Sequence, residues 1–141
     1  MAFSESAACF VAIPSGDTFA PVRKAVIEAL EEFQVKTLDP LDISETGQVS
    51  ANELIERADF VIADASGANK MVLYELGVAS GLRKPTLVMI QDTADLPIDL
   101  SLQRPLIYRP EEVSKLAAYL RYWIPDAIAL QRKKNISSWA V

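Results

Sequence analysis

The most constraining feature of the sequence is the stretch Ala58–Gln91, which reads as a strand, a loop, a helix and a second strand. Two apolar runs, Phe60–Ala63 and Thr86–Ile90, have the length and composition of buried strands. Between them lies the polar segment Asp64–Lys70, followed by Met71–Leu82, in which apolar residues recur at helical spacing. A strand, a crossing helix and a second strand form a βαβ unit, so the two strands are expected to be parallel.

The same alternation of apolar runs and helical segments continues on both sides of this stretch. Three further strands are predicted, at Ala7–Ile13, Gln34–Leu38 and Pro105–Tyr108. Three further helices are predicted, from Pro21 to about Phe33, over Ala51–Ala58 behind a Ser50 cap, and from Glu111 until Pro125 interrupts the pattern. Continuously apolar strands are typical of a sheet covered on both faces. We therefore expect an α/β fold: a flavodoxin-like (Rossmann-like) five-stranded parallel sheet in the order 2-1-3-4-5, with helices on both faces.

Length, charge and cysteine content limit what such a chain can be. Its 141 residues fit one α/β domain over residues 1–125, with residues 126–141 as a C-terminal helix or tail. The net charge of −5 argues against a nucleic-acid polymer as partner. No apolar run reaches the roughly 18 residues that span a bilayer, and the N-terminus lacks the positive charge of a signal peptide. A single cysteine, Cys9, excludes an internal disulfide framework. We expect a soluble, cytoplasmic protein without a membrane partner.

The absence of histidine restricts the chemistry that is available. Without any histidine, neither histidine triads nor His-ligated zinc sites can form, and one cysteine cannot build a thiolate metal cage. Catalysis would have to rest on carboxylates, hydroxyls, lysine or backbone dipoles. We therefore expect no metal and no cofactor.

In a sheet of this order, ligands bind where the strand order reverses, between strands one and three. Two loops end at that crevice, Pro14–Phe19 and Asp64–Lys70. The topology brings five candidate residues toward one pocket: Ser15, Gly16, Asp64, Asn69 and Glu75. The backbone of two dipeptides in these loops, Ser15-Gly16 and Ser66-Gly67, offers hydrogen-bond donors for a phosphate.

Asp64 and Glu75 are the candidate catalytic residues. Two carboxylates at the mouth of a parallel sheet suit cleavage of a glycosidic bond, because a carboxylate stabilises or attacks the oxocarbenium-like transition state. Non-functional interpretations stay open. Glu75 can be a surface residue of its helix, and Asp64 and Asn69 can be turn or capping residues. Gly77 favours the functional reading, since a glycine inside a helix often marks a close approach by a backbone or a ligand.

Two segments of the chain resemble a known family. IPSGDTFAPVRKAVIEALEE and ADFVIADASGANKMVLYELGVASGLRKPTLVMIQD are similar to the nucleoside 2-deoxyribosyltransferase-like superfamily, and in particular to its small TIR-like nucleotide-binding proteins. The most specific part is the pattern D-x-S/T-G-x-N-x-x-V-x-Y-E-L-G-x-A, from Asp64 to Ala79. The resemblance implies that Glu75 is the nucleophile that takes the sugar. Asn69 stands where the transferases keep a second acid.

The resemblance carries further expectations for the site and its partners. It places Gly16 and Phe19 on the substrate-lid side, and it implies a homo-oligomer, because a neighbouring subunit often completes these sites in relatives. In TIR-type NAD-cleaving enzymes the catalytic glutamate occupies a similar helix, which again indicates Glu75. The substrate-binding candidates are thus Ser15, Gly16, Phe19, Ser66, Gly67 and Asn69.

The favoured function is cleavage or transfer at the N-glycosidic bond of a nucleoside, a nucleotide or NAD, with NAD as a substrate and not a cofactor. The alternative is a TIR-like module that senses a nucleotide, or assembles with copies of itself, and catalyses nothing. A third reading, a phospho-acceptor receiver domain, lacks the paired acids after the first strand and the lysine after the fifth.

Overall fold

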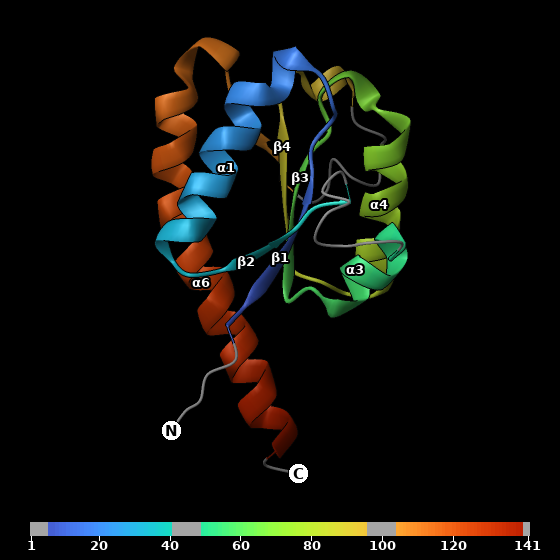
Figure 1. The fold of residues 1–141 in the computed structure, drawn as a ribbon, viewed down its shortest axis with the longest axis vertical. Coiled ribbons are helices and arrows are strands. Elements are labelled where there is room, and N and C mark those ends of the chain that lie inside the picture. Colours follow the sequence, from blue (N-terminus) through green and yellow to red (C-terminus); the bar gives the residue numbers. More distant parts are fainter. Residues whose placement is uncertain (1–5, 41–48, 96–103, 140–141) are drawn as a thin grey trace.

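Five parallel strands form one sheet in the order β2-β1-β3-β4-β5, which confirms the predicted class and strand order (Figure 1). The strands are β1 (Ala8–Ala12), β2 (Lys36–Leu38), β3 (Phe60–Asp64), β4 (Thr86–Ile90) and β5 (Leu106–Ile107). The computed structural model describes residues 6–40, 49–95 and 104–139, with side chains described as far as residue 133. The loop predicted after the second strand lies mostly outside the described residues.

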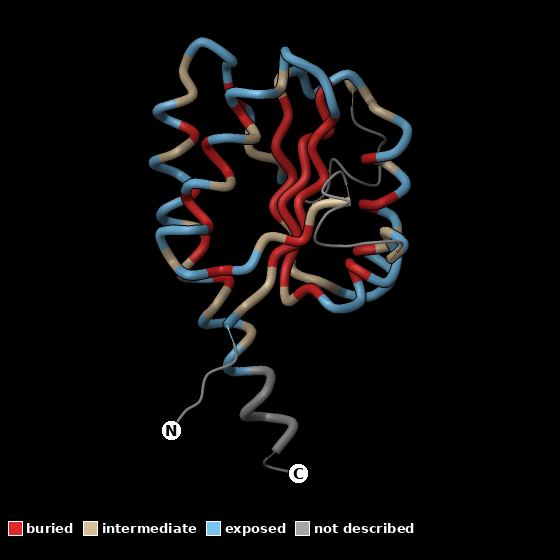
Figure 2. The backbone as a smooth tube through the Cα atoms, in the orientation of Figure 1, coloured by how far each residue is buried: buried red, intermediate tan, exposed pale blue. Residues whose placement is uncertain are grey.

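Among the described residues, four α-helices cover the two faces of the sheet (Figure 1). They are α1 (Ala20–Glu32), α3 (Ala51–Arg57), α4 (Lys70–Gly81) and α6 (Val113–Trp139). Helices α1 and α6 pack on one face, and α3 and α4 pack on the other. The central strands β1, β3 and β4 are red along most of their length in Figure 2, whereas the edge strands are less buried and the helices are buried only on their inward sides. The crossing helices explain why the strand sequences are apolar on both faces.

Successive buried residues of the central strands β1, β3 and β4 enter different cores. In β1, Cys9 and Val11 belong to the core under α1 and α6, whereas Phe10 and Ala12 belong to the core under α3 and α4. Cys9 is fully buried, and burial raises the pKa of its thiol well above the ordinary value. This strict alternation decides which pocket any residue at a strand end can reach.

Helix α6 runs through Pro125 without a break, so the prediction that this proline interrupts the helix is wrong. A proline inside a helix removes one backbone hydrogen bond, which normally ends or kinks the helix. Here Ile124 and Ala127, on either side of the proline, are both buried against the sheet. Packing therefore holds the helix together across the missing bond. The division of the chain at residues 125 and 126 stays a prediction.

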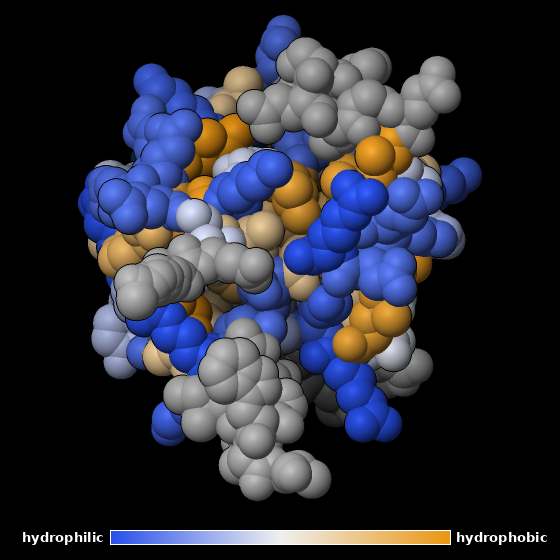
Figure 3. Space-filling model, turned by 60° about the horizontal axis from the view of Figure 1, so that its bottom comes forward, coloured by the Kyte–Doolittle hydropathy of each residue, from blue (hydrophilic) through white to orange (hydrophobic). Residues whose placement is uncertain are grey.

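The predicted cap of α3 is confirmed, because the Ser50 hydroxyl accepts a hydrogen bond from the N–H of Glu53 at 3.2 Å. No helix among the described residues is long and apolar enough to cross a membrane. Figure 3 turns the end of the molecule at which β1 begins toward the viewer. On that face, hydrophilic side chains separate the apolar ones into small groups.

Candidate active site

A pocket of about 420 Å³ lies at the carboxyl ends of β1 and β2, on the sheet face that α3 and α4 cover. This volume falls within the roughly 300–1,000 Å³ typical of small-molecule sites. The described lining residues are Val11, Ala12, Ile13, Pro14, Ser15, Asp39, Pro40, Val49, Ala51, Asn69, Met71, Val72 and Glu75. The wall is thus mostly apolar and carries a small set of polar side chains, as expected where a few groups orient a ligand.

Glu75 reaches the pocket because it lies on the side of α4 that packs toward the sheet, beside the buried Val72 and Leu76. Only 4% of Glu75 is exposed. Within the part of the chain that the structure describes, Glu75 has no hydrogen bond or ion pair. Burial, and after it the negative charge of Asp39, raises the pKa of Glu75 to about 7. Glu75 is therefore a carboxylate at a pocket wall whose protonation changes near neutral pH.

An irregular turn between β3 and α4 brings Asn69 to the same pocket. Gly67 and Ala68 both have positive φ, of 73° and 52°, and this conformation costs an alanine about 1 kcal/mol. Asn69 then caps α4, because its Oδ1 accepts a hydrogen bond from the N–H of Val72 at 3.1 Å. The position at which the resemblance implies an acid in transferases thus holds a helix cap.

Asp39 is a pocket residue that the sequence reasoning missed. It directly follows β2 and lines the pocket together with Glu75. The available signal was its place at a strand end: parallel strands present their carboxyl ends at one edge, so Asp39 belongs to the same edge as Ser15. Asp39-Pro40 predicts the start of a loop, and Asp39 was therefore not considered as a pocket residue.

The structure does not bring Asp64 into this pocket. Asp64 alternates along β3 with Ala63, which faces α4, so its side chain points under α1 and α6. There it accepts hydrogen bonds from the Tyr108 hydroxyl and, at 2.9 Å, from the N–H of Ser66. Burial raises the pKa of Asp64, although both hydrogen bonds act to lower it. Burial, followed by the bond to Asp64, raises the pKa of Tyr108 to about 12.

The remaining candidates are not among the described lining residues of this pocket. Ser66 Oγ accepts a hydrogen bond from the N–H of Gln91 at 3.0 Å, and the N–H of Gly67 donates to Asp95 at 2.8 Å. Phe19 packs against the core under α1 and α6. Gly16 has a φ of 120°, which strains any other residue, so its described role is to form the turn after β1. Of the candidates from sequence, Ser15, Asn69 and Glu75 share the pocket.

The charged groups that line the pocket are acidic. Asp39 and Glu75 are charged lining residues, and no lysine or arginine is among the described lining residues. The neighbouring residues 41–48, outside the described structure, contain no lysine or arginine in their sequence. Among the described residues, no group of three or more histidine, cysteine, aspartate or glutamate side chains is placed to hold a metal ion. The pocket thus favours a ligand with hydrogen-bond donors over a phosphate.

The fold that carries this pocket is similar to that of two solved structures. A 2-deoxyribosyltransferase from Leishmania mexicana matches 62% of this chain at 27% identity and a TM-score of 0.50. The match spans 66% of that chain, just under two thirds of its length. A 2-deoxyribosyltransferase from the psychrotolerant bacterium Bacillus psychrosaccharolyticus matches 81% of this chain and 96% of its own, at 16% identity and a TM-score of 0.56.

The chain therefore has a nucleoside 2-deoxyribosyltransferase-like fold. No protein-family profile and no curated protein sequence matches it. The two structures support the transferase part of the resemblance; the TIR-like part stays a prediction.

Proposed function

We propose that the protein cleaves or transfers the N-glycosidic bond of a nucleoside, with Glu75 as the nucleophile. The observation that carries this proposal is the Glu75 carboxylate itself: buried at the wall of the 420 Å³ pocket, with a pKa of about 7, on a fold shared with 2-deoxyribosyltransferases. A residue that only stabilised the fold would be expected to have a hydrogen-bond or ion-pair partner. A nucleophile needs an accessible carboxylate instead.

The reaction needs no group beyond the substrate and its acceptor. The ionised Glu75 carboxylate attacks the anomeric carbon, and the bond from that carbon to the base nitrogen breaks. The base leaves with the electron pair of that bond and takes up a proton from water, and the acceptor that attacks in the next step returns a proton to water. A second base or a water molecule then attacks the anomeric carbon, and Glu75 leaves as the free carboxylate. Ser15 and Asn69 lie on the same wall, where they contact the sugar or the base in this proposal.

The electrostatics of the pocket favour a nucleoside over a nucleotide or NAD. Phosphate groups bind to arginine, lysine or unpaired backbone N–H groups. The Glu75 carboxylate in the lining opposes a phosphate, the Arg23 guanidinium behind the pocket is already paired with Asp39, and no lysine or arginine is among the described lining residues. Of the substrate classes that the sequence leaves open, the uncharged nucleoside fits this pocket best.

A second candidate is a nucleoside-binding module without catalysis. The observation that favours it is Asn69, whose amide oxygen is used to cap α4. An amide in this place cannot protonate the leaving base as a carboxylic acid does. The binding module predicts tight nucleoside binding with no chemical change.

The experiment is incubation of the protein with 2′-deoxyadenosine, with and without hypoxanthine as acceptor, and in parallel with NAD. Chromatography then detects free adenine, exchanged nucleoside or nicotinamide. We expect adenine release or exchange, abolished in Glu75→Gln and retained in Glu56→Gln, which changes an exposed glutamate on α3. Binding of 2′-deoxyadenosine without release or exchange would favour the binding module. An active Glu75→Gln variant would remove Glu75 from the mechanism.

A further inference from the structure

A second carboxylate stands in the pocket at a place that the Glu75 mechanism does not use. Asp39 and Glu75 line the same wall, one from the end of β2 and the other from α4. Their like charges oppose each other, and this repulsion adds to the effect of burial on Glu75. An ionised Glu75 in this largely apolar pocket therefore lowers the stability of the empty protein. A ligand that donates a hydrogen bond to Glu75 recovers part of that free energy.

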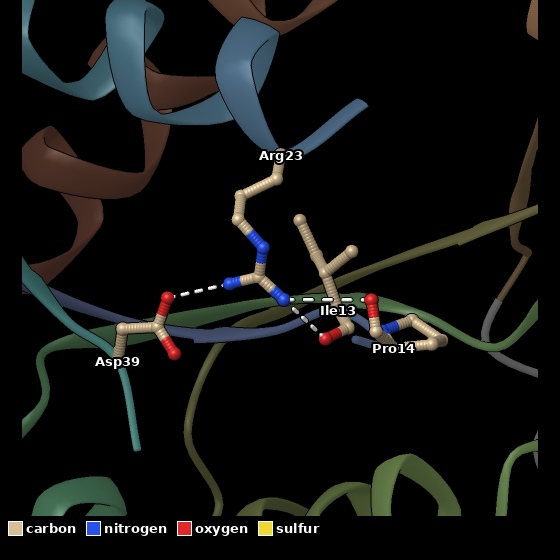
Figure 4. Close-up of polar contacts among 4 residues, drawn as sticks. All are labelled: Ile13, Pro14, Arg23 and Asp39. Atoms are coloured by element: carbon tan, nitrogen blue, oxygen red, sulfur yellow. Dashed lines mark hydrogen bonds and ion pairs between the residues drawn. The ribbon is translucent and has the colours of Figure 1, made fainter. Parts of the chain in front are cut away.

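Arg23 holds Asp39 in position (Figure 4). Its guanidinium reaches from α1 past the end of β1, and Nη1 forms an ion pair with Asp39 Oδ2. Nη2 donates to the carbonyl oxygens of Ile13 at 2.6 Å and Pro14 at 3.5 Å. The side chains of Arg23 and Asp39 are only 21% and 12% exposed. One guanidinium thus fixes the Asp39 carboxylate relative to the end of β1, where Ser15 begins the pocket rim.

The backbone around Asp39 restricts it further. A residue that precedes proline is held in an extended conformation, and Asp39 precedes Pro40. Pro40 lines the pocket as well. With its carboxylate in an ion pair and its backbone restricted by the following proline, Asp39 has the pre-organisation expected of a binding residue.

We propose that Asp39 is a second substrate-binding carboxylate, which accepts a hydrogen bond from a donor of the nucleoside, and that Arg23 is its positioning residue. This inference rests on the proposed function, because it takes a nucleoside as the ligand of the pocket. A nucleoside carries two kinds of donor, the sugar hydroxyls and the amino group of the base. Asp39, which directly follows β2, would thus supply an acid to the same pocket in which residue 69 is the amide Asn69.

The test compares the wild type and Asp39→Asn on four probes: 2′-deoxyadenosine, two analogues that lack the 3′- or the 5′-hydroxyl, and purine 2′-deoxyriboside, which lacks the amino group. On 2′-deoxyadenosine we expect kcat/KM to fall by about tenfold, because a charged acceptor is lost. On the analogue that lacks the donor bound by Asp39, the same substitution should change kcat/KM by less than about twofold. That pattern identifies the donor as a hydroxyl of the sugar or the amino group of the base.

Two controls separate binding from a structural role. Glu32→Gln removes an exposed arginine–carboxylate pair, with Arg121, from the same helix as Arg23, and it should leave all four rates unchanged. Asp39→Ser is a second variant if Asp39→Asn fails to fold, and circular dichroism checks both. An equal loss on all four probes, or no loss on any, would overturn the role of Asp39.

The outcome also distinguishes this inference from the proposed function. If the wild type releases no base, calorimetric binding of the same four probes replaces kcat/KM. A fall in affinity that vanishes on one analogue then supports Asp39 as a binding residue, while the catalytic proposal fails. If the wild type neither turns over nor binds any probe, both proposals are wrong.

Discussion

Asp64 and Glu75 lie on opposite faces of the sheet. The Asp64 carboxylate accepts a hydrogen bond from Tyr108 under α1 and α6, whereas Glu75 lines the pocket under α3 and α4. The acid that shares the pocket with Glu75 is Asp39. The two acids of the β3–α4 unit therefore have different surroundings, and we expect substitutions at each to separate stability from activity.

The first prediction concerns the pH dependence of base release. In the proposed reaction Glu75 is an ionised nucleophile, so kcat/KM should fall on the acid side with a midpoint near its pKa of about 7. Asp39→Asn removes the negative charge that adds to burial, so the midpoint should move to lower pH. Initial rates between about pH 5 and 9 measure both curves. An acid limb at the same pH in the variant would contradict the electrostatic coupling of the two acids.

The second prediction is that Glu75→Gln stabilises the protein above neutral pH. Folding raises the pKa of Glu75 from 4.5 to about 7, so between these values the folded state binds more protons than the unfolded state. Stability therefore falls as the pH rises through this window. At pH 8 the substitution should raise the free energy of unfolding by roughly 1–3 kcal/mol. Near pH 4.5 the difference should vanish.

Denaturant unfolding at both pH values measures this difference. If the variant is less stable than the wild type at pH 8, the ionised Glu75 side chain does not lower the free energy of unfolding of the wild type, and the prediction is wrong. A catalytically dead and more stable variant is the outcome expected of a strained functional residue.

The third prediction concerns the contact between Asp64 and Tyr108. Tyr108→Phe leaves the buried Asp64 without one of its donors, which should lower the free energy of unfolding by about 1–3 kcal/mol. Base release by the folded variant should stay within about twofold of the wild type, because Tyr108 is not among the pocket residues. Tyr122→Phe, at a tyrosine of α6 that is 74% exposed, is the matched control for stability. A large fall in kcat with unchanged stability would instead place Asp64 and Tyr108 in the reaction.

The fourth prediction is that Gly77→Ala stabilises α4. A Cβ at Gly77 would meet no described atom within 4 Å, so the described chain does not make the close approach that the sequence led us to expect. Alanine should raise the free energy of unfolding by up to about 1 kcal/mol. The same change at Gly67, whose φ is 73°, should destabilise the protein. If Gly77→Ala is stable but loses activity, an approach by substrate or by another subunit is indicated.

The sheet order was predictable because short apolar strands alternate along the chain with segments of helical periodicity. That alternation is typical of a doubly wound parallel sheet. The position of Glu75 was predictable because the helix after β3 starts at the carboxyl edge of the sheet. The face of the sheet on which the Asp64 side chain lies was not predictable. Strand β3 is buried on both faces, so its sequence does not show which alternate residues lie under α4. Ala63 and Asp64 are neighbours in the sequence, yet they enter different cores.

Asp39 escaped prediction for a related reason. Strand β2 has only three residues, and its burial increases along the strand from Lys36 to Leu38. So short a run, followed by proline, gives no periodicity from which the direction of the next side chain follows. The continuity of α6 through Pro125 depends on contacts with the sheet core, which local sequence does not record.

The buried thiol of Cys9 has a practical consequence for testing these proposals. It is the single cysteine of the chain, fully enclosed in the core and held as the unreactive thiol. A cysteine introduced at Met71, which lines the pocket and is 59% exposed, would then be the preferred target of a thiol-directed fluorophore. Because Cys9 should contribute little labelling, a change in fluorescence on addition of a nucleoside would report binding at the pocket.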